Sequence, residues 1–217
     1  MNSTTGSGPQ AILGGTFNPI HFGHLRCAIE LTEQLGLEQT RLMPSAQPPH
    51  RAQPSCSASH RAAMVELAVA EESLLRCDQR ELKRSGPSYT IDSLSELRKE
   101  LGPDVSLSLA MGLDALHGLA SWHCWESLLD HAHIVVMTRP GWALPAQGQV
   151  AEWLDRHKTN RRDAITELPN GNVWLQELRP LPISSTEIRS LLQSGQSARY
   201  LLPESVLDYI QSNELYV

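Results

Sequence analysis

Hydrophobic residues along this 217-residue chain follow two repeating patterns. Short apolar runs, typical of buried strands, alternate with longer segments in which apolar residues recur every three or four positions, as in amphipathic helices. Strands that alternate with helices predict βαβ units and a parallel sheet. The pattern therefore predicts an α/β fold, doubly wound and Rossmann-like, with a mostly parallel sheet, helices on both faces and a small C-terminal helical part.

The predicted elements are spread over most of the chain. Strands are expected at 11–13, 40–43, 74–82, 105–111, 133–138 and 173–178. Helices are expected at 25–35, 60–71, 91–101, 148–162, 183–193 and 203–212, with short helical pieces at 115–119 and 125–129. Residues 1–10 are predicted to form a disordered lead-in to a single domain over 11–217. Residues 45–59 hold three prolines and predict a long loop, which is either functional or a plain surface connection.

Composition narrows the function classes. The net charge of -6 argues against a nucleic-acid partner, and no apolar run reaches the length of a membrane span. The N-terminal residues lack the apolar stretch of a signal peptide. The four cysteines have no paired spacing, which indicates reduced thiols and a cytoplasmic location. Nothing in the sequence indicates the oligomeric state.

The first strand leads into an unusual turn that runs Gly14-Gly15-Thr16-Phe17-Asn18-Pro19-Ile20-His21-Phe22-Gly23-His24. Paired glycines let a ligand come close to the backbone, and the start of the following helix offers free N–H groups and a positive dipole end. Each of the two histidines could donate a hydrogen bond to a phosphate oxygen. The turn therefore predicts a site for a nucleotide phosphate.

Other interpretations of the histidines and glycines are weaker. No Gly-Lys-Ser/Thr follows, so the turn is not a P-loop, and the spacing of the dinucleotide fingerprint is absent. Two histidines are too few for a zinc site. His123, Cys124, His131 and His133 have the right chemistry for a metal, but their spacing is irregular. We therefore expect no protein-bound metal site.

A second candidate segment begins near residue 183. Ser184, Ser185 and Thr186 precede a predicted helix, and such a cluster places N–H groups and hydroxyls where an anion can bind. Arg189 would lie within about the first turn of that helix. An ordinary helix cap with a surface arginine is the alternative on this stretch alone.

Together the two segments resemble a known family. His21-Phe22-Gly23-His24 matches the H-x-G-H hallmark of a nucleotidyltransferase superfamily, and residues 183–189 match its I-S-S-T-x-I-R motif. The longer run from Gly14 to Leu25 resembles the bacterial nicotinate-nucleotide adenylyltransferases. The resemblance implies that His21, His24 and Arg189 are catalytic. It also implies that ATP contacts Gly14, Gly15, Thr16, Phe17, Gly23, Ser185, Thr186 and Arg189.

Further matches lie in the middle of the chain. Gln47-Pro48-Pro49-His50-Arg51 resembles the family's P-P-H-K loop, with Arg51 in place of lysine, and residues 88–94 resemble its S-Y-T-x-D-T-L helix start. Met111-Gly112-Leu113-Asp114 with Trp122, and Arg139-Pro140-Gly141, resemble two more family motifs. The resemblance implies that the nicotinate mononucleotide contacts Asn18, Arg51, Tyr89, Thr90, Gly112, Asp114, Trp122 and Arg139.

The reaction implied by the resemblance is adenylyl transfer from ATP to nicotinate mononucleotide, which gives deamido-NAD and pyrophosphate in NAD biosynthesis. Mg²⁺ would accompany ATP and be held mainly by phosphate and water. Two alternatives stay open. The acceptor could be nicotinamide mononucleotide or phosphopantetheine, or the chain could be a nucleotide-sensing module without turnover.

Overall fold

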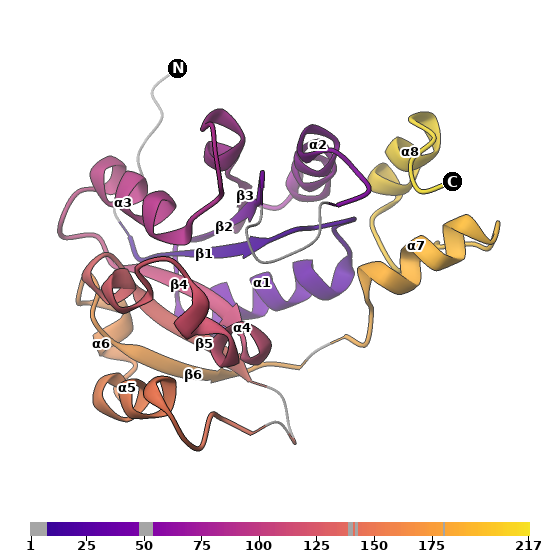
Figure 1. Cartoon of the computed structure of the whole chain (residues 1–217). Coiled ribbons are helices and arrows are strands. Elements are labelled where there is room, and N and C mark those ends of the chain that lie inside the picture. The colour runs from indigo at the N-terminus through magenta and orange to yellow at the C-terminus, as the bar shows by residue number, and fades with distance from the viewer. Residues whose placement is uncertain (1–7, 48–53, 139–140, 142, 180) are drawn as a thin grey trace.

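The protein is built on one six-stranded parallel sheet (Figure 1). The structure, a computed structural model, describes residues 8–47, 54–138, 141, 143–179 and 181–217. The strand order is β3-β2-β1-β4-β5-β6. The strands are β1 (Gln10–Gly15), β2 (Gln39–Pro44), β3 (Leu75–Cys77), β4 (Leu107–Gly112), β5 (His133–Thr138) and β6 (Val173–Glu177).

Helices connect the strands and follow the last of them. The α-helices are α1 (Phe22–Leu35), α2 (Ala58–Val69), α3 (Thr90–Leu101), α4 (Leu113–His117), α5 (Gln149–His157), α6 (Asp163–Thr166), α7 (Ser185–Gln193) and α8 (Glu204–Ser212). Three short 3-10 helices are η1 (Arg80–Lys83), η2 (Leu119–Ser121) and η3 (Trp125–Asp130).

The sheet has a hydrophobic core on each face, because successive side chains of a strand point in opposite directions. In β1, Ala11 and Leu13 belong to the core that includes α1, α2 and α8. Ile12 points the other way and belongs to the core that includes α3, α4 and α5. Strands buried on both faces are apolar throughout, which explains the continuous apolar runs in the sequence. The predicted doubly wound α/β fold is confirmed.

Helix α1 shows how the apolar spacing fixes an element. Leu25, Ala28, Leu31 and Leu35 recur at helical intervals and are all buried. The helix ends at Gly36, whose φ of 66° suits a residue without a side chain and whose N–H bonds back to the last turn. The helix begins at Phe22, one turn earlier than predicted, because its first turn faces the site and lacks the apolar spacing.

Two predicted elements proved too long. The strand predicted at 74–82 ends at Cys77, and η1 follows it. Asp78 is buried there and pairs with Arg41 and Arg80, a tertiary contact that the alternating pattern does not reveal. The helix predicted at 148–162 ends at His157 as α5, because the next residue, Lys158, forms a bridge with Val173, and α6 lies beyond the predicted end.

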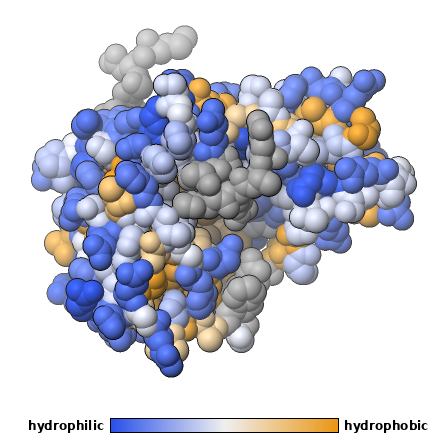
Figure 2. All heavy atoms as spheres, viewed as in Figure 1, coloured by the Kyte–Doolittle hydropathy of each residue, from blue (hydrophilic) through white to orange (hydrophobic). Residues whose placement is uncertain are grey.

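Helices α7 and α8 form the C-terminal helical part and lie beyond the carboxyl end of β1 (Figure 1). Helix α8 contributes Val206, Leu207 and Ile210 to the core shared with α1 and α2. Polar residues dominate the face seen in Figure 2, where apolar residues form small scattered patches. Among the helices that the structure describes, none is long and apolar enough to cross a membrane.

Candidate active site

A hollow lies where the sheet reverses its winding. The chain moves outward from β1 through β2 to β3 and then crosses to β4 on the other side of β1. In open α/β sheets, ligands bind in the crevice at the carboxyl ends of the two strands that flank this point. A cavity of about 530 Å³ occupies it, with Gly14 and Gly15 on one side and Gly112 and Asp114 on the other.

The glycine turn after β1 leaves room for a ligand near the backbone. Gly14 is exposed, and no atom lies within 4 Å of the position that a Cβ would occupy. Gly15 differs, because a Cβ there would lie 2.8 Å from the ring of Phe17. Phe17 itself adopts a left-handed φ of 47° and is buried. Its ring fills the space beneath the turn and meets the edge of the His24 ring, with the ring centroids 5.1 Å apart.

The two histidines lie together at the start of α1. His21 is the N-cap residue and His24 lies in the first turn, so the two side chains project from the same end of the helix. Their rings stack with centroids 3.7 Å apart and planes inclined by 27°. The residue between them, Gly23, leaves no room for a side chain, since a Cβ there would lie 2.9 Å from the His21 ring.

Burial keeps both histidines neutral at physiological pH. It lowers the pKa of His21 from 6.5 to about 4. Burial also lowers the pKa of His24, to about 3, and repulsion from His21 adds to the effect. The Nδ1 atoms of both rings are buried without a hydrogen-bond partner among the described residues. A neutral imidazole can donate a hydrogen bond to an anion, and a bound phosphate would raise the pKa values of both rings.

Helix α7 approaches the glycine turn from the far end of the chain. Its N-cap Ser184 accepts a hydrogen bond from the Glu187 N–H, as the sequence predicts. The Ser185 hydroxyl donates to the Pro19 carbonyl at 2.8 Å. The N-termini of α1 and α7 are therefore neighbours, and two positive dipole ends converge near the histidines.

Arg189 lies on the second turn of α7 and contacts the same loop. Its Nη1 donates to the Asn18 carbonyl at 2.7 Å. Its Nη2 lies 3.4 Å from the hydroxyl of Thr186, one turn earlier. The guanidinium is half-buried and so retains N–H groups that can reach an anion beside α7.

The opposite wall of the cavity carries aromatic groups. Tyr89 precedes α3 and Thr90 begins it, while Trp122 follows η2. All three line the cavity, as does His123. The rings of Tyr89 and His123 lie 4.5 Å apart, so the two side chains form one aromatic surface. Such a surface suits a flat ring of a ligand.

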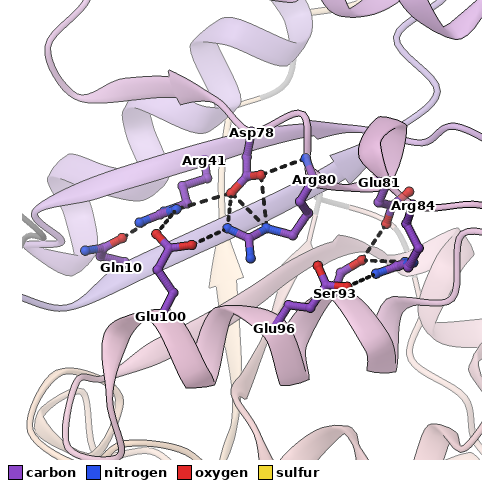
Figure 3. A network of polar contacts seen from close by, with 9 residues as sticks. All are labelled: Gln10, Arg41, Asp78, Arg80, Glu81, Arg84, Ser93, Glu96 and Glu100. Carbon is purple, nitrogen blue, oxygen red and sulfur yellow. Dashed lines mark hydrogen bonds and ion pairs between the residues drawn. The ribbon is translucent and has the colours of Figure 1, made fainter. Parts of the chain in front are cut away.

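A network of charged side chains holds the C-terminal end of α3 (Figure 3). Arg41 in β2 is 3% exposed and bonds Asp78 at 3.2 Å and Glu100 at 3.0 Å. Arg80 also bonds Glu100, at 2.8 Å, and makes a two-pronged contact with Asp78. These arginine bonds hold the pKa of Asp78 below its usual range despite burial. Both charges of the buried pair are thus compensated.

A second part of the network holds the N-terminal end of α3, next to the cavity (Figure 3). The Ser93 hydroxyl donates to buried Glu81 at 2.9 Å. Arg84 bonds Glu96 at 2.8 Å and also reaches Ser93. Burial raises the pKa of Glu81. Arg84 and Ser93 also donate to the Tyr89 carbonyl, so this part of the network holds the start of α3 beside the cavity that Glu81 lines.

The structure brings most of the predicted site residues to the cavity, though not all. Those that line it are Gly14, Gly15, Thr16, Phe17, His24, Tyr89, Thr90, Gly112, Asp114 and Trp122. Among the described residues, His21, Gly23, Ser185, Thr186 and Arg189 lie outside the lining and adjoin it through the histidine stack and α7. Arg51 and Arg139 lie outside the described residues.

Asn18 is held from within the protein. It is predicted to contact the acceptor, and it is 9% exposed and lies outside the cavity lining. Its Oδ1 accepts a hydrogen bond from the Tyr216 hydroxyl, and its carbonyl accepts one from Arg189. Both oxygens of Asn18 are therefore engaged by the protein, and its contact with the acceptor stays a prediction.

Several polar residues of the lining were not predicted as site residues. They are Ser45, Glu81, Ser88, Ser93, Ser121 and His123. Ser88 and Ser93 lie within the recognised 88–94 motif, and Ser121 and His123 flank Trp122, so their positions were an available signal. Glu81 and Ser45 offered none, because only the folded sheet places them at the cavity. His133, considered earlier as a metal ligand, is buried and bonded to the Leu168 carbonyl and the Asn172 N–H.

Known proteins share this fold and sequence. The cytidylyltransferase-like family model matches residues 12–191. An Aeromonas hydrophila protein named probable nicotinate-nucleotide adenylyltransferase is 52% identical, over 96% of this chain and 97% of its own. A Pseudomonas putida protein of the same name is 47% identical, over 94% and 93% of the two chains. This chain belongs to the nicotinate-nucleotide adenylyltransferase family.

A solved structure supports the fold of this family member. The Plasmodium falciparum nicotinic acid mononucleotide adenylyltransferase complexed with NaAD has a TM-score of 0.71 at 18% identity, covering 96% of this chain and 97% of that one. Membership of the adenylyltransferase family makes the chain a nucleotidyltransferase, an enzyme. No group of three or more His, Cys, Asp or Glu side chains that could hold a metal ion occurs in the described ranges.

Proposed function

We propose that this enzyme transfers the adenylyl group of ATP to nicotinate mononucleotide and releases pyrophosphate, a step of NAD biosynthesis. One observation carries the proposal: two neutral, stacked histidines, of which His24 lines the switch-point cavity, lie where the N-termini of α1 and α7 converge. An electrically neutral donor pair between two positive helix ends suits a polyphosphate that becomes more negative as the bond to the leaving group breaks.

The proposed chemistry needs alignment more than covalent help. The phosphate of the mononucleotide attacks the α-phosphorus of ATP in line, and the bond to the bridging oxygen of pyrophosphate breaks on the far side. His24, which lines the cavity, donates from its ring to the α-phosphate. His21 and Arg189 act on the outer phosphates, joined by Ser185 and Thr186 at the start of α7. The exposed backbone of Gly14 gives the nucleotide its closest approach to the chain.

The acceptor occupies the aromatic side of the cavity in this proposal. Trp122 stacks on the pyridine ring, and Tyr89 with Thr90 flanks it from the start of α3. Asp114, at the carboxyl end of β4, contacts the ribose together with the Gly112 backbone. Arg51 and Arg139, outside the described residues, are proposed from motif position alone as phosphate contacts of the acceptor.

Mg²⁺ is proposed to enter with ATP as part of the substrate. A hard cation of this kind prefers phosphate oxygens and water over a dedicated protein cage. It would neutralise charge on the β- and γ-phosphates. The four cysteines, all among the described residues, form no disulfide, which supports the proposed cytoplasmic location.

A panel of acceptors tests this function. Pyrophosphate release from ATP would be measured with nicotinate mononucleotide, nicotinamide mononucleotide and phosphopantetheine in parallel. We expect the highest kcat/KM with nicotinate mononucleotide. A higher kcat/KM with either of the other acceptors would show that nicotinate mononucleotide is not the preferred acceptor. Nucleotide binding with no pyrophosphate from any acceptor would favour the sensing module instead.

A further inference from the structure

Residues 16–21 form a loop that ends at His21 and leads into the helix turn with His24, and hydrogen bonds from distant parts of the chain hold this loop. The guanidinium of Arg61 in α2 donates to the Thr16 carbonyl at 2.6 Å. On the other side, Ser185 holds the Pro19 carbonyl and Arg189 holds that of Asn18. We call residues 16–21 the histidine loop.

Tyr216 supplies another of these bonds. Its hydroxyl donates to Asn18 Oδ1 at 2.6 Å, and both residues are 9% exposed. Burial raises the pKa of Tyr216, so its hydroxyl keeps its proton and remains a donor over the whole physiological range. The side chain of Cys56 adjoins the same hydroxyl, and the Cys56 carbonyl accepts a bond from Arg61. Tyr216 therefore contacts both Asn18 in the loop and Cys56, whose carbonyl is bonded to the Arg61 side chain that holds the loop.

The position of Asn18 makes this bond important for the site. Its carbonyl receives Arg189, and three residues later His21 begins α1. A change in the Asn18 side chain therefore reaches both the arginine and the histidines. Removal of the Tyr216 hydroxyl would leave the buried Asn18 Oδ1 without a donor. An unpaired buried acceptor is costly, so the Asn18 side chain should shift to find another partner.

We propose that Tyr216 is a positioning residue for adenylyl transfer. Its hydroxyl orients Asn18, and Asn18 in turn fixes Arg189 and the histidine loop in one relative geometry. Tyr216 itself contacts no ligand space, because within the described residues it does not line the cavity. The inference rests on the proposed function and adds a residue that acts on the site through Asn18, without contacting the ligand.

The chain offers a matched control in Tyr209. This tyrosine belongs to α8, and its hydroxyl bonds His60 Nδ1 in α2 at 2.9 Å. Replacing Tyr209 by Phe removes one tyrosine hydrogen bond from the same C-terminal helical part but none from the histidine loop. If both hydroxyls were purely structural, Tyr216→Phe and Tyr209→Phe should lower the stability of the protein by similar amounts and should have the same kcat.

The experiment compares Tyr216→Phe, Tyr209→Phe and the unaltered protein in pyrophosphate release, with thermal unfolding measured alongside. We expect Tyr216→Phe to lower kcat about tenfold or more, since small misplacements of reacting groups cost this much, with KM values changed far less. Tyr209→Phe should keep the kcat of the unaltered protein. Equal kcat in both variants would overturn the positioning role. An unaltered protein without turnover would overturn the proposed function, and this inference with it.

A double-variant comparison tests the route through Asn18. If Tyr216 acts only by orienting Asn18, then adding Tyr216→Phe to Asn18→Ala should lower kcat no further. Losses that multiply in the double variant would overturn that route. The comparison also holds if Tyr216→Phe is less stable, because all variants are assayed below their own unfolding temperatures.

Discussion

His21, at the N-cap of the helix that follows the glycine turn, and His24, in its first turn, stack with their ring centroids 3.7 Å apart. Two cationic imidazoles would repel each other at this distance, and burial lowers the pKa of each ring well below 7, so both rings are neutral at physiological pH. An incoming phosphate changes this balance, because it stabilises the protonated ring. The pair can therefore gain positive charge when substrate binds.

Replacing His24 by Ala should lower kcat by about 10²–10³-fold, the usual cost of one lost hydrogen bond to a developing charge. The fold should survive, because the His24 side chain lies at the end of α1 and its buried Nδ1 makes no hydrogen bond that the variant would lose. Pyrophosphate release and circular dichroism measure the two effects. Near-native turnover in this variant would exclude His24 from catalysis.

Stability should fall in mild acid because of the same pair. Their pKa values of about 4 and about 3 lie below 6.5, so the unfolded chain takes up protons that the folded chain refuses. The cost to folding is small above about pH 6.5 and grows as the pH falls toward the folded pKa values of about 4 and about 3. At about pH 5 each histidine should cost about 2 kcal/mol relative to pH 7.

Urea unfolding of the protein and of His24→Asn at both pH values isolates this effect. The variant should lose less free energy of unfolding between neutral pH and mild acid, since one titrating ring is gone. Other titrating groups contribute equally to both proteins and cancel in the comparison. The same pH dependence in both would show that His24 is not responsible.

Trp122→Ala should raise the KM for the mononucleotide far more than the KM for ATP. Trp122 lines the aromatic side of the cavity, away from the glycine turn. Loss of a stacking surface weakens binding of the ring that lies on it and leaves the other substrate's contacts intact. Initial rates with each substrate varied in turn give the two constants. Equal increases in both would contradict a stacking role.

Arg61→Lys should destabilise the protein by about 3 kcal/mol, because one ammonium cannot replace a guanidinium that serves several buried carbonyls. Arg61 is 1% exposed and donates to the carbonyls of Thr16, Ser45 and Cys56. Arg76, exposed on β3, provides the control. Its replacement by Lys should change the free energy of unfolding by less than about 0.5 kcal/mol. Similar losses in both variants would mean that the carbonyl contacts of Arg61 contribute little.

The parts of the fold with strong local patterns were predictable from sequence. The strand before Gly14 and the helix with Leu25 and Leu31 follow from apolar spacing alone, because each element buries a regular face. The strand predicted at 74–82 ends early, at Cys77, and the next residue, Asp78, is buried in an ion pair with Arg41 of a neighbouring strand. Periodicity contains no information about such a partner.

The site shows the same division. The motif around His21 and His24 identified one side of the cavity from a short stretch of chain. The role of Asn18 could not be found this way, because its partner Tyr216 is 198 positions away. Glu81 reaches the cavity only through the folding of β3 and η1 against α3. Contacts of this kind depend on topology, which local sequence does not encode.

The separation between the histidine loop and its supports also has a consequence for the order of events during synthesis. Ser185, Arg189 and Tyr216 follow their loop partners by 166, 171 and 198 residues. A nascent chain therefore carries its histidines long before it has the groups that hold them, and domains begin to fold from the N-terminal side as they emerge. The sheet can begin to assemble early, but a competent enzyme arises only when the last helices dock.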